Sequence, residues 1–90
     1  MAWTIEFDPK ADKELKKLGS DNAKRILAFL FGRLAMSDNP RAFGEALTGA
    51  EFGEFWKYRV GDWRIIADLD DGIMLITVIR IGNRREIYRR

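Results

Sequence analysis

The side chains best suited to chemistry in this chain are cations within one short stretch, residues 55–64. Its pattern is typical of two strands joined by a tight turn at Gly61-Asp62, a β-hairpin. If the turn has two residues, Arg59 lies directly opposite Arg64, and like charges so placed destabilise a sheet by up to roughly 1 kcal/mol. Strand alternation puts Lys57 on the same face as Arg59. A chain tolerates such a conflict where an anion sits between the charges.

This cluster suits a phosphodiester, because cations can neutralise a phosphate whose negative charge grows in the transition state. RNA supplies its own nucleophile, the 2′-hydroxyl, so the protein must remove that proton, stabilise the phosphorane and assist the departing 5′-oxygen. Arginine keeps its proton at neutral pH, so Arg59 and Arg64 suit charge stabilisation. Neighbouring cations favour the uncharged form of a lysine, which makes Lys57 a candidate base. Tyr88 is the other candidate, and the sequence does not separate the two roles.

A second basic segment covers residues 80–90, which hold five arginines and one acid. Arg84 suits charge stabilisation near the leaving oxygen, and we predict that Arg80, Arg85 and Arg89 bind RNA. The other interpretation of this segment is a solvated charged edge that protects the sheet from aggregation.

Each residue of the hairpin also has a structural interpretation. Taken alone, Lys57 is typical of a solvated lysine on a strand. Arg59 and Arg64 could each pair with Asp62 or Asp68. The tryptophans, Trp56 and Trp63, are more typical of a core than of platforms for base stacking. The functional interpretation therefore depends on the grouping of the charges and not on any one residue.

The composition excludes several other chemistries. The chain has no histidine and no cysteine, so histidine-activated nucleophiles, histidine-liganded metals and thiolate sites are absent. An acidic segment, Asp68 to Asp71, precedes Gly72 and could attract a divalent cation. Asp-Asp-Gly is also what a hairpin turn requires, and we favour the turn. We therefore expect no metal and no cofactor.

The N-terminal half predicts one strand and two helices. Residues 2–7 read as a strand. Asp8-Pro9 is a helix start, and this helix runs to about Leu18. Gly19 ends it, and a second helix covers roughly residues 21–36 with an apolar stripe. The short link makes the two helices an antiparallel hairpin.

The C-terminal half predicts the sheet. Residues 37–54 read as a loop, with a weak helical turn around residues 41–47. The hairpin follows, then a turn at residues 70–72 and a strand over residues 73–81. The order β-α-α-β-β-β gives one α+β domain, residues 1–90, with the helices on one face of an antiparallel sheet. No apolar run is long enough to cross a bilayer and no signal peptide precedes the fold, so we expect a cytoplasmic protein with no membrane partner.

Five segments resemble the RelE toxins of type II toxin–antitoxin modules, in order and in spacing, across nearly the whole chain. These segments are IEFDP (5–9), KKLG (16–19), LTG (47–49), WKYRVGDWR (56–64) and IGNRREIY (81–88). The resemblance implies a compact α+β fold and a metal-independent endoribonuclease that cuts mRNA in the ribosomal A site. It also implies inhibition by a RelB-like antitoxin, in a hetero-oligomer that binds its own operator DNA.

The same resemblance implies roles for five residues. Lys57 matches a candidate base, and Arg59 is the second member of its basic pair. Arg64 matches the arginine that stabilises the phosphate, Arg84 the one that helps the leaving group, and Tyr88 the tyrosine that orients or activates the 2′-hydroxyl. Arg59 stands where some members have lysine, and only two residues follow Tyr88, so inhibition by displacing a C-terminal helix is doubtful.

Two other functions stay open at this point. A ParE-like relative would share the fold but would poison DNA gyrase by protein binding, without the basic-plus-tyrosine set. A third possibility is a catalytically silent domain that binds a partner. We expect any antitoxin to cover the basic face or two aromatics predicted to be exposed on the second helix, Phe29 and Phe31.

Overall fold

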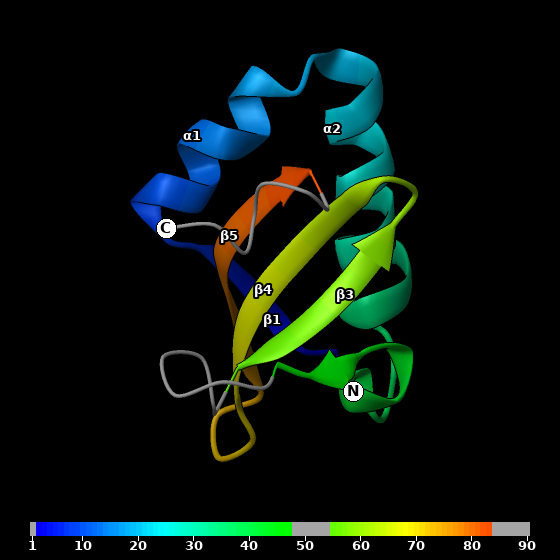
Figure 1. Cartoon of the computed structure of the whole chain (residues 1–90). Coiled ribbons are helices and arrows are strands. Elements are labelled where there is room, and N and C mark those ends of the chain that lie inside the picture. The colour runs from blue at the N-terminus through cyan, green and yellow to red at the C-terminus, as the bar shows by residue number, and fades with distance from the viewer. Residues whose placement is uncertain (1, 48–54, 84–90) are drawn as a thin grey trace.

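The computed structural model describes residues 2–47 and 55–83 and shows one sheet with its helices packed against one face (Figure 1). The strand order is β1-β5-β4-β3-β2. The elements, in chain order, are β1 (Thr4–Phe7), α1 (Pro9–Lys17), α2 (Ser20–Leu27), a π-helical segment (Ala28–Leu34), a 3-10 helix (Pro40–Phe43), β2 (Glu45–Ala46), β3 (Trp56–Val60), β4 (Trp63–Asp70) and β5 (Leu75–Asn83). The predicted α+β fold is confirmed.

The start and end of α1 follow directly from its flanking residues. The Asp8 side chain accepts a hydrogen bond from the backbone N–H of Lys10 at 3.2 Å, and Pro9 occupies the first helical position. Gly19 lies beyond the helix at φ 85°, a conformation that glycine adopts without steric cost. The helix boundaries predicted from these residues are confirmed.

The second helix changes its winding partway along. It begins as an ordinary α-helix, α2, and continues through Ala28–Leu34 with wider π turns, ending with an Ala35 N–H to Leu30 C=O bond of 2.8 Å. The predicted single helix is therefore right in extent and wrong in pitch after Leu27. Ile26, Leu30 and Leu34 are fully buried, as their spacing predicts.

The two aromatics predicted to be exposed on this helix differ. Phe31 is 48% exposed. Phe29 is partly buried against the core, with its ring 5.7 Å from that of Tyr58, so the prediction for Phe29 is wrong. A one-dimensional pattern places both near the edge of the apolar stripe, and the wider π turns decide which one packs inward.

The sheet is mixed and not wholly antiparallel, which corrects the sequence-based prediction. β1 pairs with β5 in parallel, from Thr4 opposite Leu75 to Phe7 opposite Val78. The other neighbours are antiparallel. The direction of a pairing between residues some seventy positions apart leaves no mark in local sequence, because both directions bury the same alternating face.

The segment predicted as a loop before the hairpin contains further structure. Pro40–Phe43 forms a 3-10 helix, and the two residues of β2 add an edge strand, with Glu45 opposite Lys57. Gly44 joins the two elements against the Tyr58 ring, where a Cβ would lie 2.7 Å from Tyr58 Cδ1. A side chain at this position would collide with the buried ring, so glycine allows the backbone to pass close to Tyr58.

The turn between β4 and β5 is longer than predicted. It covers residues 71–74, and Met74 takes the positive φ of 50° instead of Gly72. β5 consequently starts at Leu75 and extends to Asn83, two residues later at each end than expected. A bulge interrupts the β4–β5 ladder next to Ile66.

Two apolar clusters fix the orientation of the sheet. The large cluster joins the helices to Tyr58, Ile65 and Val78, with Trp56, Val60 and Trp63 packed around it. A small cluster, built on Leu47 and Ile66, involves the opposite face. Within the described ranges, no helix is long and apolar enough to cross a membrane.

Candidate functional site

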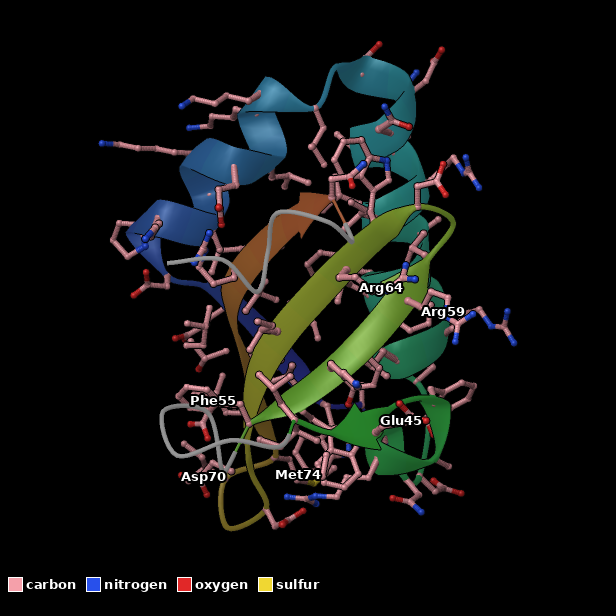
Figure 2. The ribbon with its side chains drawn as sticks, in the orientation of Figure 1. Glu45, Phe55, Arg59, Arg64, Asp70 and Met74 are labelled. Carbon is pink, nitrogen blue, oxygen red and sulfur yellow. The ribbon has the colours of Figure 1, made fainter. Side chains whose placement is uncertain are left out.

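The hairpin places Arg59 and Arg64 at directly opposite positions on its two strands. Val60 pairs with Trp63, so the turn consists of Gly61 and Asp62, with Gly61 at φ 60°. This register sets Arg59 directly opposite Arg64, as predicted. Figure 2 shows both side chains over the half of the hairpin nearest its turn.

Arg64 is held close to the turn by its own backbone. Its Nη1 donates to the carbonyl oxygen of Gly61 at 3.0 Å and to that of Trp63 at 3.0 Å. A guanidinium carries five N–H groups, so donors remain for a ligand. The side chain is thus oriented before any anion binds.

Arg59 and Arg64 have no ion-pair partner within the described part of the chain. Among residues 2–47 and 55–83, no carboxylate oxygen lies within ion-pair distance of Arg59 or Arg64. The alternative that Asp62 or Asp68 pairs with them is therefore wrong for the described structure. The hairpin turn carries positive charge that is available to an anion.

Lys57 has a partner that the sequence did not suggest. Its Nζ lies 3.6 Å from Oε2 of Glu45, and the two side chains are 33% and 75% exposed. Glu45 belongs to the edge strand β2, in register with Lys57. This acid was missed because its segment was predicted to be a loop, which gives no register.

Arg80 lies apart from the hairpin cations. Ile66 stands between Lys57 and Arg80 in the register of the three strands. The guanidinium Nε of Arg80 donates to both carboxylate oxygens of Glu14 on α1, at 3.2 and 3.1 Å, and both side chains are 22% exposed. Glu14 also accepts from the backbone N–H of Ile81 at 2.9 Å, so this pair ties α1 to β5.

The remaining predicted site residues lie outside the described residues. They are Arg84, Arg85, Tyr88 and Arg89. The last described residue, Asn83, is opposite Trp63, and Gly82 is opposite Arg64. β5 therefore ends beside the turn of the basic hairpin.

A second polar network, at the other end of β3, is structural. Arg41 donates from Nη1 to Asp71 Oδ1 at 2.9 Å, and its guanidinium lies 5.7 Å from the centre of the Trp56 ring. The hydrogen bond to Asp71 raises the pKa of Arg41, and the same bond lowers the pKa of the Asp71 carboxyl. Trp56 Nε1 donates to the Arg41 carbonyl oxygen at 3.0 Å. Trp56 is thus a structural residue, as predicted.

Tyr58 is also structural, because its ring is almost fully buried and its hydroxyl donates to the Pro40 carbonyl oxygen at 3.1 Å. Burial raises the pKa of this phenol well above its usual range. The described part of the chain contains no group of three or more acids that could hold a metal ion. Among the described residues, the candidate functional groups are therefore the cations on β3 and β4.

The comparisons with known proteins match this chain over almost its full length. A family model described as "ParE toxin of type II toxin-antitoxin system, parDE" matches residues 5–88. The toxin RelG of Mycobacterium tuberculosis is 31% identical over 90 residues, which is all of both chains. The mRNA interferase toxin RelE of Escherichia coli is 29% identical, over 98% of this chain and 92% of that protein.

Solved structures agree with these relatives. The toxin–antitoxin complex RelBE2 of Mycobacterium tuberculosis contains a chain with a TM-score of 0.83 and 25% identity, covering 93% of this chain and all of that one. The isolated RelE toxin of Escherichia coli has a TM-score of 0.70 and 26% identity, over 97% of this chain and 92% of that one.

Proposed function

The chain belongs to the RelE family of type II toxins, in the superfamily that also includes the ParE toxins, and we propose that it is a metal-independent endoribonuclease that cleaves mRNA in the ribosomal A site. The observation that carries this proposal is the Arg59–Arg64 pair, which lacks a neutralising carboxylate in the described structure. Two arginines at directly opposite positions of one hairpin suit a group whose negative charge grows during reaction.

The proposed reaction needs little chemistry from the protein. The 2′-oxygen attacks the adjacent phosphorus after losing its proton to a base, and the bond to the 5′-oxygen breaks as that oxygen takes a proton. The products are a 2′,3′-cyclic phosphate and a 5′-hydroxyl. Arg59 and Arg64 stabilise the phosphorane, Arg84 assists the leaving oxygen, and Lys57 or Tyr88 accepts the first proton.

The proposed inhibitor is a RelB-like antitoxin. RelBE complexes are among the solved structures most similar to this chain, including the RelBE2 complex of Mycobacterium tuberculosis. We expect the toxin and antitoxin to form a hetero-oligomer that binds its own operator DNA. Exposed Phe31 and the basic hairpin are the surfaces that such a partner would cover.

The gyrase-poisoning alternative shares the name of the matching family model, ParE. The relatives that match over almost their full length are RelG and RelE toxins, and two of them are named mRNA interferases. These names favour RNA cleavage over gyrase poisoning for this chain.

The test is cleavage of mRNA on programmed ribosomes by the purified full-length chain, with the 5′ ends mapped. We expect a cut within the A-site codon. The cut should persist when the programmed ribosomes are first cross-linked chemically, divalent ions are then chelated, and the protein is added last. An intact message with wild-type protein would sink the proposal. DNA breaks dependent on gyrase, after expression in cells, would support the ParE-like alternative instead.

A further inference from the structure

A third arginine, Arg25 of α2, approaches the turn of the basic hairpin. The position that a Cβ on Gly61 would occupy lies 3.2 Å from Arg25 Nη2 and 3.7 Å from its Cζ. The carbonyl oxygen of the same glycine accepts the hydrogen bond from Arg64. Two guanidinium groups therefore converge on Gly61, one from the helix layer and one from the sheet.

The charges at this turn are not balanced within the described structure. Like Arg59 and Arg64, Arg25 has no ion-pair partner among residues 2–47 and 55–83. Asp62 is the acid of the turn itself, and it too makes no ion pair there. Arg41 and Arg80, by contrast, each have a carboxylate partner. Within the described residues, three arginines without an ion-pair partner therefore belong to elements that meet at this turn, namely α2, β3 and β4.

We propose that Arg25 binds an RNA phosphate at the hairpin turn, a second phosphate that is distinct from the one cleaved near Arg59 and Arg64. A phosphodiester fits because its free oxygens accept charge-assisted hydrogen bonds from a guanidinium group. Arg25 approaches the turn from the helix layer, whereas Arg59 and Arg64 belong to the sheet, so the two phosphates bind on different sides of the turn. This inference rests on the proposed function, which places the reacting phosphate over the sheet face of Arg59 and Arg64.

Gly61 itself lies next to the Arg25 guanidinium. A Cβ there would meet the Arg25 guanidinium at a distance tighter than ordinary van der Waals contact. The φ of 60° also disfavours other residues. The positive φ is therefore what favours glycine here, and a side chain would shift the Arg25 guanidinium by only a few tenths of an ångström.

The phosphate could belong to the message or to ribosomal RNA, and two binding assays distinguish these sources. One uses a single-stranded RNA made uncleavable by 2′-O-methyl groups, and the other uses vacant ribosomes without message. Each is run with full-length wild type, Arg25→Gln, Arg25→Lys and the matched control Lys24→Gln, across a series of salt concentrations. Lys24 is exposed on the same helix, so its substitution removes the same charge from a different side.

We expect Arg25→Gln to weaken binding about five-fold and to reduce the slope of log affinity against log salt by about 0.7 for the single strand. Arg25→Lys should keep most of the slope, and Lys24→Gln should match wild type. If Arg25→Gln weakens binding only to the single-stranded RNA, the phosphate belongs to the message. If it weakens binding only to vacant ribosomes, the phosphate belongs to ribosomal RNA. If Arg25→Gln and Lys24→Gln have equal affinities and equal salt slopes in both assays, the proposed phosphate site is wrong.

The failure of this inference can be told from failure of the proposed function. Wild-type protein that binds RNA but cuts no message disproves the nuclease, while the comparison of Arg25→Gln with Lys24→Gln still decides the phosphate site. Wild-type protein that cuts message, with Arg25→Gln unchanged in kcat and in KM, rejects the phosphate site alone. The phosphate site predicts a raised KM with kcat nearly unchanged, because Arg25 acts in binding.

Discussion

Glu45 on the edge strand β2 and Lys57 on β3 are in register, and their charged groups lie 3.6 Å apart. Under the proposed function, this acid competes with an RNA phosphate for the ammonium group. We expect Glu45→Gln to tighten RNA binding two- to five-fold, as about one extra phosphate contact would at low salt. Affinity for uncleavable RNA measures this effect. The control is Glu6→Gln, an exposed acid on β1, and an equal gain in both variants would show only a change in net charge.

Arg64→Ala should lower the rate of message cleavage by about a hundred-fold or more, because the proposed role of Arg64 is to stabilise the charge that develops on the phosphorane. Arg84→Ala should do the same if its role is the one that the resemblance implies. The Arg64 bonds to the turn carbonyls are partly exposed, so the free energy of unfolding should fall by only about 1 kcal/mol. Single-turnover cleavage and urea denaturation separate the two effects.

The control for this experiment is Arg33→Ala, which removes an arginine that lies over the Phe43 ring and outside the hairpin. It should leave cleavage near the wild-type rate. Cleavage by Arg64→Ala at that same rate would exclude Arg64 from the chemistry.

Glu14→Ala should destabilise the fold by about 2 kcal/mol, because it removes the hydrogen-bond acceptor of the half-buried Arg80 guanidinium and of the Ile81 N–H. Glu14→Gln should cost less, since its amide oxygen still accepts from Ile81. Asp12→Ala breaks an exposed ion pair with Lys16 on the same helix and should cost about 0.5 kcal/mol or less. Thermal unfolding of the three variants checks this order, and equal costs for Glu14→Ala and Asp12→Ala would contradict it.

Tyr58 should make stability depend on pH in alkali. Burial raises the pKa of its phenol in the folded state above the ordinary value of 10.0, so above that pH the unfolded chain loses a proton that the folded chain retains. The free energy of unfolding should then fall by about 1.4 kcal/mol per pH unit. Its contribution is complete below pH 10 and is lost as the pH rises toward the folded-state value.

Tyr58→Phe isolates this effect, because it deletes the titrating hydroxyl and keeps the ring. It should lower stability at neutral pH by about 1 kcal/mol through the lost bond to Pro40. Between pH 9 and pH 11 its unfolding free energy, from urea denaturation, should fall less steeply than that of wild type. Parallel curves for the two proteins would assign the alkaline loss to other groups.

Local features of the sequence predicted the hairpin well. The two-residue turn at Gly61-Asp62 fixes which residues of β3 and β4 are opposite, so the Arg59–Arg64 pair followed from counting. Alternation then separated Lys57 and Arg59 from the buried Tyr58. The helix that starts at Asp8-Pro9 was equally accessible, because its cap lies within its own sequence.

Features that depend on distant contacts were not predictable in the same way. The Glu45 partner of Lys57 requires an edge strand of two residues, which is too short to show any periodicity. The approach of Arg25 to Gly61 joins residues 36 positions apart, and Arg25 by itself looks like any exposed helix cation. The parallel pairing of β1 with β5 was not predicted for the same reason, because it also joins residues that are distant in sequence.

That parallel pairing also constrains how the molecule is made. Thr4 meets Leu75, so β1 is synthesised long before the strand against which it pairs. β5 lies inside the sheet, between β1 and β4, and supplies Ile76, Val78 and Ile81 to the core. Before β5 is synthesised, the apolar sides of both helices therefore lack part of the sheet that covers them. Pairing between residues this far apart in sequence slows folding in general. A nascent chain that stops before Leu75 has the basic hairpin but lacks the strand that joins it to β1, so cleavage activity should appear only after β5 has emerged.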